Sequence, residues 1–209
     1  MRRLAVAAAL VGALISLTAC DDGKPQGITL DNRPDAPQSN VDVDTPELRQ
    51  QKAAAGILDC TPGPGGGRLP AIELPCLGGG TPVDLSSLRG PMVLSFWASW
   101  CEACGEEMPA LQEFADDHGD RVPVLGVDYA DLYPDEALET MQERGVTYPS
   151  LADPGGDVKG FEEFTKPLNY LPAIFLIDAD GSIAYVNMGG VKSEDQVVDL
   201  VEDHLGVTL

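Results

Sequence analysis

Apolar residues form short runs along the chain, and these runs predict the strands of an α/β fold. Met92 to Ala98 is a continuous apolar run of strand type, which is typical of a strand buried on both faces. Val122 to Val127 is a second run of this kind. Ala173 to Ile177 and Ser182 to Met188 flank the turn residues Asp178 to Gly181, so they predict two further strands joined as a hairpin.

Stretches with helical spacing separate and follow these strands. A helix is expected to open at Cys101 and to continue past Pro109 to about Ala115, because the apolar positions share one face. Pro134 to Arg144 predicts a second helix, and Ser193 to Leu205 predicts the last. The order strand, helix, strand, helix, strand, strand, helix indicates a mixed central sheet covered on both faces.

Smaller elements are expected ahead of this core. Thr45-Pro46-Glu47 is typical of a helix start and predicts a short helix to about Ala55. Ala71 to Leu74 and Thr81 to Leu85 predict two short strands on either side of three consecutive glycines. Between them and the short helix, the glycine-rich and proline-rich stretch over residues 62–67 predicts a loop.

The first residues are typical of an export signal. Two arginines precede an apolar stretch over residues 4–17, which is too short to span a bilayer as a helix. The stretch ends in Leu17 to Cys20 (Leu-Thr-Ala-Cys), which resembles the bacterial lipobox, where a diacylglycerol is attached to the cysteine and a peptidase cuts before it. The alternative is an ordinary secretory signal in which Cys20 is incidental.

These patterns divide the chain into three parts. Residues 1–19 are predicted to be a lipoprotein signal peptide, residues 20–55 a flexible tether ending in the short helix, and residues 56–209 one folded domain. Asp21 to about Thr45 is rich in Asp, Pro, Gln and Asn and lacks the apolar surface needed to fold alone. The expected location is the extracytoplasmic face of the bacterial cell membrane, with the chain anchored through lipid on Cys20.

Composition limits the partners of the chain. Apolar residues make up 44% of the 209 residues, which is enough for one hydrophobic core. The formal net charge is -21, so the chain would repel phosphate backbones. Nucleic acid is therefore excluded as an expected partner.

The cysteine count fits disulfide pairing in an exported protein. Five cysteines are present, and four remain if Cys20 carries lipid. Three pairings are possible, and the spacing favours Cys101 with Cys104 and Cys60 with Cys76. In the chain-entropy model, a structural Cys60–Cys76 bond closing a loop of about 15 residues stabilises the fold by about 3 kcal/mol. The alternative is a second redox pair that relays electrons.

Two cysteines separated by two residues at a helix start are suited to reversible disulfide chemistry. The N-terminal N–H groups of the helix stabilise a thiolate, so Cys101 is the expected nucleophile. Cys104 lies one turn further along and can resolve a mixed disulfide, while Trp100 can shield the pair. The alternative is a structural zinc site, which needs two more soft ligands in a second close pair, and Cys60 and Cys76 are not such a pair. Neither a metal nor a cofactor is expected.

Two adjacent segments carry a family resemblance. SFWASWCEAC (residues 95–104) resembles the signature of the thioredoxin fold, and EEMPAL (residues 106–111) resembles the TlpA/ResA-like branch of extracytoplasmic disulfide reductases. The resemblance extends from about residue 68 to residue 205. It implies a thioredoxin fold with an N-terminal β-hairpin extension and an insert, over residues 129–166, between the second and third core strands.

The same resemblance implies roles for single residues. LPAIFLID (residues 171–178) resembles the segment that carries the family's cis-proline, which implies that Pro172 lies against the cysteine pair and that Leu171 binds substrate backbone. Cytosolic thioredoxins carry a buried aspartate where this chain has Ser95. The TlpA/ResA-like branch implies that Glu107 serves in proton exchange instead, and the alternative is a solvated surface glutamate. Glu106 is expected to lie at the surface.

The resemblance also implies a function. The expected activity is reduction of disulfides in exported proteins, with apocytochrome c as one substrate and an upstream membrane thiol donor of electrons. Glu102 places an anion beside Cys101, which predicts a reducing or intermediate potential. The alternatives are a thiol oxidase or isomerase that uses the same pair, a peroxiredoxin-like peroxidase, which would need a lone reactive cysteine, and a non-enzymatic binding module.

Overall fold

The computed structural model describes residues 39–209. The predicted signal peptide, Cys20 and most of the predicted tether lie outside the described residues. Within residues 39–209, no helix has both the length and the apolar character needed to cross a membrane.

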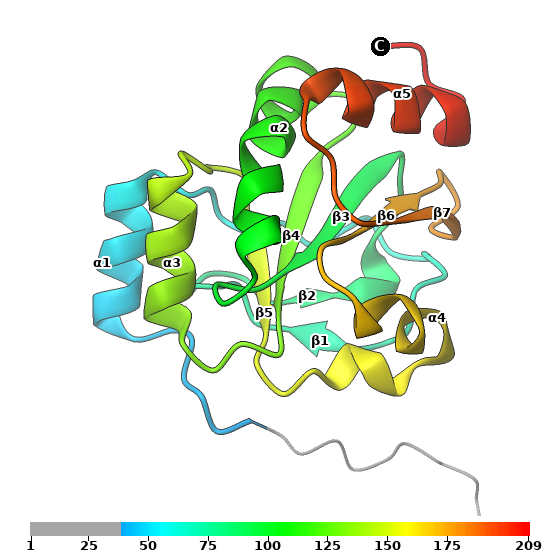
Figure 1. Cartoon of the computed structure of the whole chain (residues 1–209). Coiled ribbons are helices and arrows are strands. Elements are labelled where there is room, and N and C mark those ends of the chain that lie inside the picture. Colours follow the sequence, from blue (N-terminus) through cyan, green and yellow to red (C-terminus); the bar gives the residue numbers. More distant parts are fainter. Residues whose placement is uncertain (1–38) are drawn as a thin grey trace, which may run out of the picture. The chain divides into compact units, whose positions relative to one another are not determined.

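A five-stranded mixed sheet forms the centre of the described fold (Figure 1). Its order is β5-β4-β3-β6-β7, in which β3 pairs in parallel with β4 and antiparallel with β6. The strands are β3 (Met92–Trp97), β4 (Val124–Tyr129), β5 (Ser150–Asp153), β6 (Ala173–Ile177) and β7 (Ile183–Met188). The predicted mixed sheet and the final hairpin are therefore confirmed.

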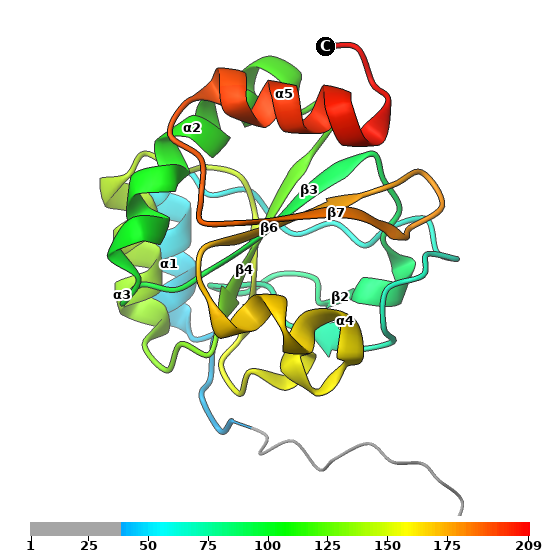
Figure 2. The same ribbon diagram turned by 45° about the vertical axis from the view of Figure 1, so that its right-hand side comes forward.

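Four helices cover one face of the sheet: α1 (Pro46–Ala55), α2 (Glu102–His118), α3 (Pro134–Glu143) and α5 (Glu194–Leu205). Side chains from these helices form one hydrophobic cluster with inward-facing residues of β3, β4 and β6. Figure 2 shows α2 and α5 crossing over this face, and α1 lies beside α3 in both views. Helix α2 ends three residues later than predicted and continues through Pro109 to His118.

The opposite face is covered by shorter elements. The hairpin β1 (Glu73–Leu74) and β2 (Val83–Asp84) confirms the two predicted strands, although each is shorter than expected. Helix α4 (Glu162–Thr165) and the 3-10 helices η1 (Leu85–Ser87), η2 (Asp157–Gly160) and η3 (Pro167–Asn169) complete this layer. Phe164 of α4 packs on Phe96 and Phe175 with ring centroids 5.4 and 5.0 Å apart, so α4 is held directly on the sheet.

Two features differ from the sequence prediction. Strand β5 was not predicted, because Ser150–Asp153 is a four-residue mixture of polar and apolar residues without a clear strand pattern. It lies at the edge of the sheet beside β4. Helix α1 is present as predicted, but it is packed into the domain through buried Leu48 and Lys52. The packed part of the chain therefore begins ahead of residue 56, where the sequence analysis placed the start of the domain.

Candidate active site

The two cysteines of the motif lie at the N-terminus of α2 and are joined by a disulfide with a Cα–Cα distance of 5.3 Å. Cys101 is the N-cap residue, and its Sγ accepts a hydrogen bond from the backbone N–H of Cys104 at 3.2 Å. Cys101 is partly exposed, whereas Cys104 is buried. This arrangement leaves one sulfur open to an incoming molecule and places its partner one turn deeper.

The loop ahead of Cys101 is fixed by hydrogen bonds that the sequence analysis did not anticipate. Asp131 Oδ2 accepts from the Ser99 backbone N–H at 2.7 Å and from Ser99 Oγ at 2.5 Å. The exposed indole of Trp100 donates from Nε1 to the Ala130 carbonyl at 3.4 Å. The loop that follows β4 therefore holds the loop that presents Cys101.

The predicted cis bond is confirmed at Leu171–Pro172. Ala173, the next residue, pairs with Phe96 in the antiparallel ladder of β6 and β3. This register places Pro172 beside the end of β3, from which the chain runs directly into the cysteine loop. A second cis bond, Gly90–Pro91, was not predicted.

Glu107 is a buried carboxyl group, not a solvated one, and its exposed fraction is 2%. Its Oε2 accepts from the Val191 backbone N–H at 3.1 Å, and Ser95 Oγ donates to Oε1 at 3.3 Å. Burial raises the pKa of Glu107 to about 7, and these two hydrogen bonds oppose the rise. Its neighbour Glu106 is exposed, as predicted. A carboxyl group that titrates near neutral pH can both release and accept a proton under working conditions.

Gly190 brings the proline and the carboxyl group together. A Cβ at this position would lie 3.1 Å from Pro172 Cγ and 3.2 Å from Glu107 Oε2. Gly190 also has a φ of +77°, a conformation that favours glycine. The loop after β7 is thus a third segment of the site, and nothing in the sequence motif indicated it.

A second group of carboxyl groups lies behind the cysteine loop. Asp128 is the second-last residue of β4 and pairs with Trp97 of β3. Its pKa is raised well above the ordinary value by burial and by the nearby Asp131 and Asp153. A charged residue directly after a buried apolar run is a sequence signal that could have identified Asp128. In the part of the chain that the structure describes, no cluster of three or more His, Cys, Asp or Glu residues could hold a metal ion.

The second predicted cysteine pairing is also confirmed. Cys60 and Cys76 form a disulfide with a Cα–Cα distance of 5.8 Å, and both residues are buried. The predicted structural role of this bond stays a prediction, because the pairing by itself does not distinguish a structural bond from a redox-active one.

Comparison with known proteins agrees with this geometry. The model of the AhpC/TSA family matches residues 66–186. The chain is 36% identical over 134 residues to a thiol:disulfide interchange protein, a DsbE homolog of Paracoccus denitrificans, covering 62% of this chain and 69% of the relative. It is 31% identical over 117 residues to the thiol-disulfide oxidoreductase ResA of Bacillus thuringiensis, covering 55% of this chain and 65% of ResA.

A solved structure agrees as well. The exposed lipoprotein thioredoxin Etrx1 of Streptococcus pneumoniae superposes with a TM-score of 0.52 at 25% identity, covering 63% of this chain and 98% of that protein. The thioredoxin-like fold and the ResA-like resemblance are therefore confirmed. The chain belongs to the AhpC/TSA family and is a thiol-disulfide oxidoreductase of the DsbE and ResA type.

Proposed function

We propose that this chain reduces disulfides of exported proteins at the extracytoplasmic face of the bacterial cell membrane, with apocytochrome c among its substrates. The observation that carries the proposal is the disulfide at the start of α2, with partly exposed Cys101, buried Cys104 and buried Glu107 on successive turns. A reactive sulfur, a resolving sulfur and a proton-exchanging group are the three parts that the reaction needs.

The reaction begins with the dithiol form. The Cys101 thiolate attacks one sulfur of a substrate disulfide, the substrate bond breaks, and its other sulfur leaves with the electron pair and takes a proton. Cys104 loses its proton and attacks Cys101 Sγ, which releases the second substrate sulfur and forms the Cys101–Cys104 bond. The substrate gains two electrons and two protons, and an upstream membrane dithiol returns them to the enzyme.

The surroundings of the cysteine pair suit an unfolded polypeptide. Five large apolar side chains are more than half exposed in the segments that border the pair; these residues, called the apolar rim here, are Trp100, Leu132, Tyr133, Tyr170 and Met188. The backbone of Leu171 makes no hydrogen bond within residues 39–209, so its N–H and C=O can pair with an extended substrate. Apolar contacts and backbone pairing recognise chains without selecting one sequence.

Glu102 is expected to favour the reducing direction. It is exposed in the first turn of α2, where its charge opposes the stabilisation of the Cys101 thiolate by the helix terminus. Glu102→Gln is therefore expected to lower the pKa of the Cys101 thiol and to make the couple more oxidising. Redox titration against glutathione measures the potential, with exposed Glu106→Gln as the matched control. A Glu102→Gln couple that is equally or more reducing contradicts the argument.

Anchoring through Cys20 is a separate part of the proposal. The lipobox-like residues 17–20 support it, and the similar Etrx1 protein is described as an exposed lipoprotein. Cys20→Ser is expected to move the chain from the membrane fraction to the soluble extracytoplasmic or culture fraction, because the acyl chains would be lost. Fractionation followed by immunoblotting measures this, and unchanged membrane retention contradicts lipid anchoring through Cys20.

Trapping tests the proposed direction and substrate. A Cys104→Ala chain cannot resolve its mixed disulfides, so substrates should stay bonded to Cys101 in cells. Recovery of apocytochrome c among several disulfide-containing exported proteins supports the proposal. If the trapped proteins are only secreted proteins that still need to form their disulfides, the result favours the oxidase or isomerase alternative and contradicts the proposal.

A further inference from the structure

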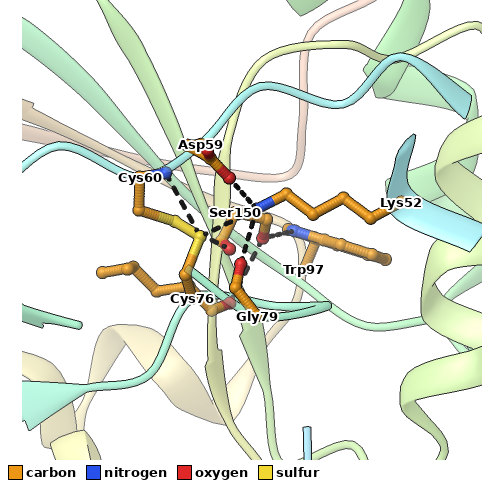
Figure 3. The surroundings of a disulfide bond; sticks show 8 residues. Lys52, Asp59, Cys60, Cys76, Gly79, Trp97 and Ser150 are labelled. Carbon is orange, nitrogen blue, oxygen red and sulfur yellow. Dashed lines mark hydrogen bonds and ion pairs between the residues drawn. A yellow bond between two sulfur atoms is a disulfide. The ribbon is translucent and has the colours of Figure 1, made fainter. Parts of the chain in front are cut away.

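The second disulfide, Cys60–Cys76, lies against a buried lysine (Figure 3). The Lys52 side chain is only 6% exposed, and its Nζ lies 3.3 Å from Cys76 Sγ. The same Nζ lies 2.7 Å from the Gly79 carbonyl and 2.9 Å from Asp59 Oδ1. An ammonium group has three N–H donors, and each of these three contacts uses one of them. One N–H of Lys52 therefore points at Cys76 Sγ.

The two sulfurs of this bond have opposite surroundings. Cys76 Sγ faces two donors, the Lys52 ammonium at 3.3 Å and the Cys60 backbone N–H at 3.2 Å. Cys60 Sγ lies 3.3 Å from the carbonyl oxygen of Ser150, which can only accept a hydrogen bond. After reduction, these neighbours favour a thiolate at Cys76 and a protonated thiol at Cys60.

This asymmetry determines which sulfur leaves during exchange. Thiol-disulfide exchange is faster when the departing sulfur is stabilised as a thiolate. Burial of Cys76, whose exposed fraction is 1%, works against the anion, and the ammonium and N–H contacts work in its favour. A purely structural disulfide needs no ammonium group at one of its sulfurs.

We propose that Cys60–Cys76 is a second redox-active disulfide, which a dithiol opens by attacking Cys60 and releasing Cys76 as the thiolate. The attacking sulfur bonds to Cys60 Sγ, the Cys60–Cys76 bond breaks, and its electron pair stays on Cys76 beside Lys52. The second sulfur of the dithiol then attacks the first and displaces Cys60, which takes a proton and, as a thiol, donates a hydrogen bond to the Ser150 carbonyl. The dithiol becomes a disulfide, and the chain gains two electrons.

The position of Cys60 fits the attacked sulfur. Cys60 lies in the segment between α1 and β1, and its neighbours Leu58, Asp59 and Thr61 are all exposed. Cys76 lies deeper, in an isolated bridge with Leu151 of β5. A small movement of the exposed segment therefore uncovers Cys60 before Cys76.

The test uses the full chain with Cys20, Cys101 and Cys104 replaced by serine, so that the second pair holds the only cysteines. Dithiothreitol is added, samples are quenched with an alkylating agent, and mass spectrometry follows the opening of Cys60–Cys76, while circular dichroism confirms that the chain stays folded. We expect Lys52→Met to slow the opening about tenfold, because the leaving thiolate loses its ammonium. The exposed Lys166→Met is the matched control and is expected to leave the rate unchanged.

The sign of the effect separates the proposal from its alternative. A purely structural disulfide is reduced through unfolding, so loss of the buried Lys52 contacts would destabilise the fold and speed the opening. Asp59→Asn is expected to speed the opening, since the 80% exposed Asp59 carboxylate competes with the thiolate for Lys52. If Lys52→Met fails to fold, the pH titration of thiolate absorbance in the otherwise unchanged chain decides. Faster opening in Lys52→Met, no change in Asp59→Asn, or a Cys76 pKa above that of Cys60 overturns the proposal.

Discussion

Cys101→Ser is expected to abolish disulfide reduction, with a loss on the order of 10³-fold or more, because a serine hydroxyl is not deprotonated at neutral pH and supplies no nucleophile. Cys101 is the partly exposed sulfur at the start of α2, and Cys104 is buried behind it. The measurement is turnover of a disulfide-bonded model peptide with dithiothreitol as the electron donor, corrected for direct reduction by dithiothreitol.

Cys104→Ala is the informative partner of this variant. It keeps the nucleophile and loses the resolving thiol, so the first attack should proceed and a mixed disulfide on Cys101 should accumulate. If Cys101→Ser is inactive and Cys104→Ala accumulates the mixed disulfide, Cys101 is the nucleophile and Cys104 is the resolving thiol. A Cys101→Ser chain that still forms mixed disulfides through Cys104 would contradict the assignment.

Glu107→Gln is expected to change the pH dependence of stability, because Glu107 is a buried carboxyl group with a raised pKa. Burial raises the pKa of Glu107 from 4.5 to about 7. The folded chain therefore keeps a proton that the unfolded chain loses, so this group's contribution to stability is present below pH 4.5 and is lost as the pH rises through 7. The full loss is on the order of 3 kcal/mol, because the pKa of Glu107 in the folded chain lies well above its value in the unfolded chain.

Urea unfolding of both oxidised chains at pH 5 and pH 8 measures this effect. Glutamine keeps an acceptor for Val191 and Ser95 but carries no charge, so Glu107→Gln should be more stable than the parent at pH 8 and close to it at pH 5. Asp128 and Asp153 also titrate abnormally, but they are present in both chains and cancel in the difference. An equal difference at both pH values would contradict a Glu107 pKa near 7.

The same substitution also tests proton exchange. Glu107 lies one turn from Cys104 on α2, so its loss should slow the step in which Cys104 gives up its proton. The rate of mixed-disulfide resolution in Glu107→Gln is expected to lose the pH dependence that the parent shows near pH 7. Glu106→Gln, one residue away on the exposed side of the helix, is expected to leave the profile unchanged.

The central strands and the redox motif could be predicted from sequence because their signals are local. The apolar run of β3 and the helical spacing from Cys101 are each read within about ten residues. The family resemblance predicted the cis bond before Pro172 and a proton-exchange role for Glu107. Residue spacing alone would not have identified either. The pairing of Cys60 with Cys76 followed from the cysteine count and spacing.

The features that could not be predicted from the sequence depend on contacts between segments that lie far apart along the chain. Strand β5 lies at the edge of the five-stranded sheet beside β4, and its short sequence carries no clear strand pattern. The hydrogen bonds from Ser99 to Asp131, and from Val191 to Glu107, join residues 32 and 84 positions apart. The contact between Lys52 and Cys76 could not be predicted either, because Lys52 lies on α1, which was predicted to lie outside the folded domain.

The proposed activity requires that Cys101 and Cys104 cycle reversibly between disulfide and dithiol, and a redox titration measures this. The oxidised chain and the reduced chain are each equilibrated in a series of glutathione buffers of increasing redox potential. Free thiols are then alkylated, and mass spectrometry measures the fraction of each chain that is reduced. We expect one reversible two-electron transition of this pair, with the same midpoint from either direction. A pair that stays closed or open at every redox potential, or reduced thiols that hold zinc, would contradict the proposed activity.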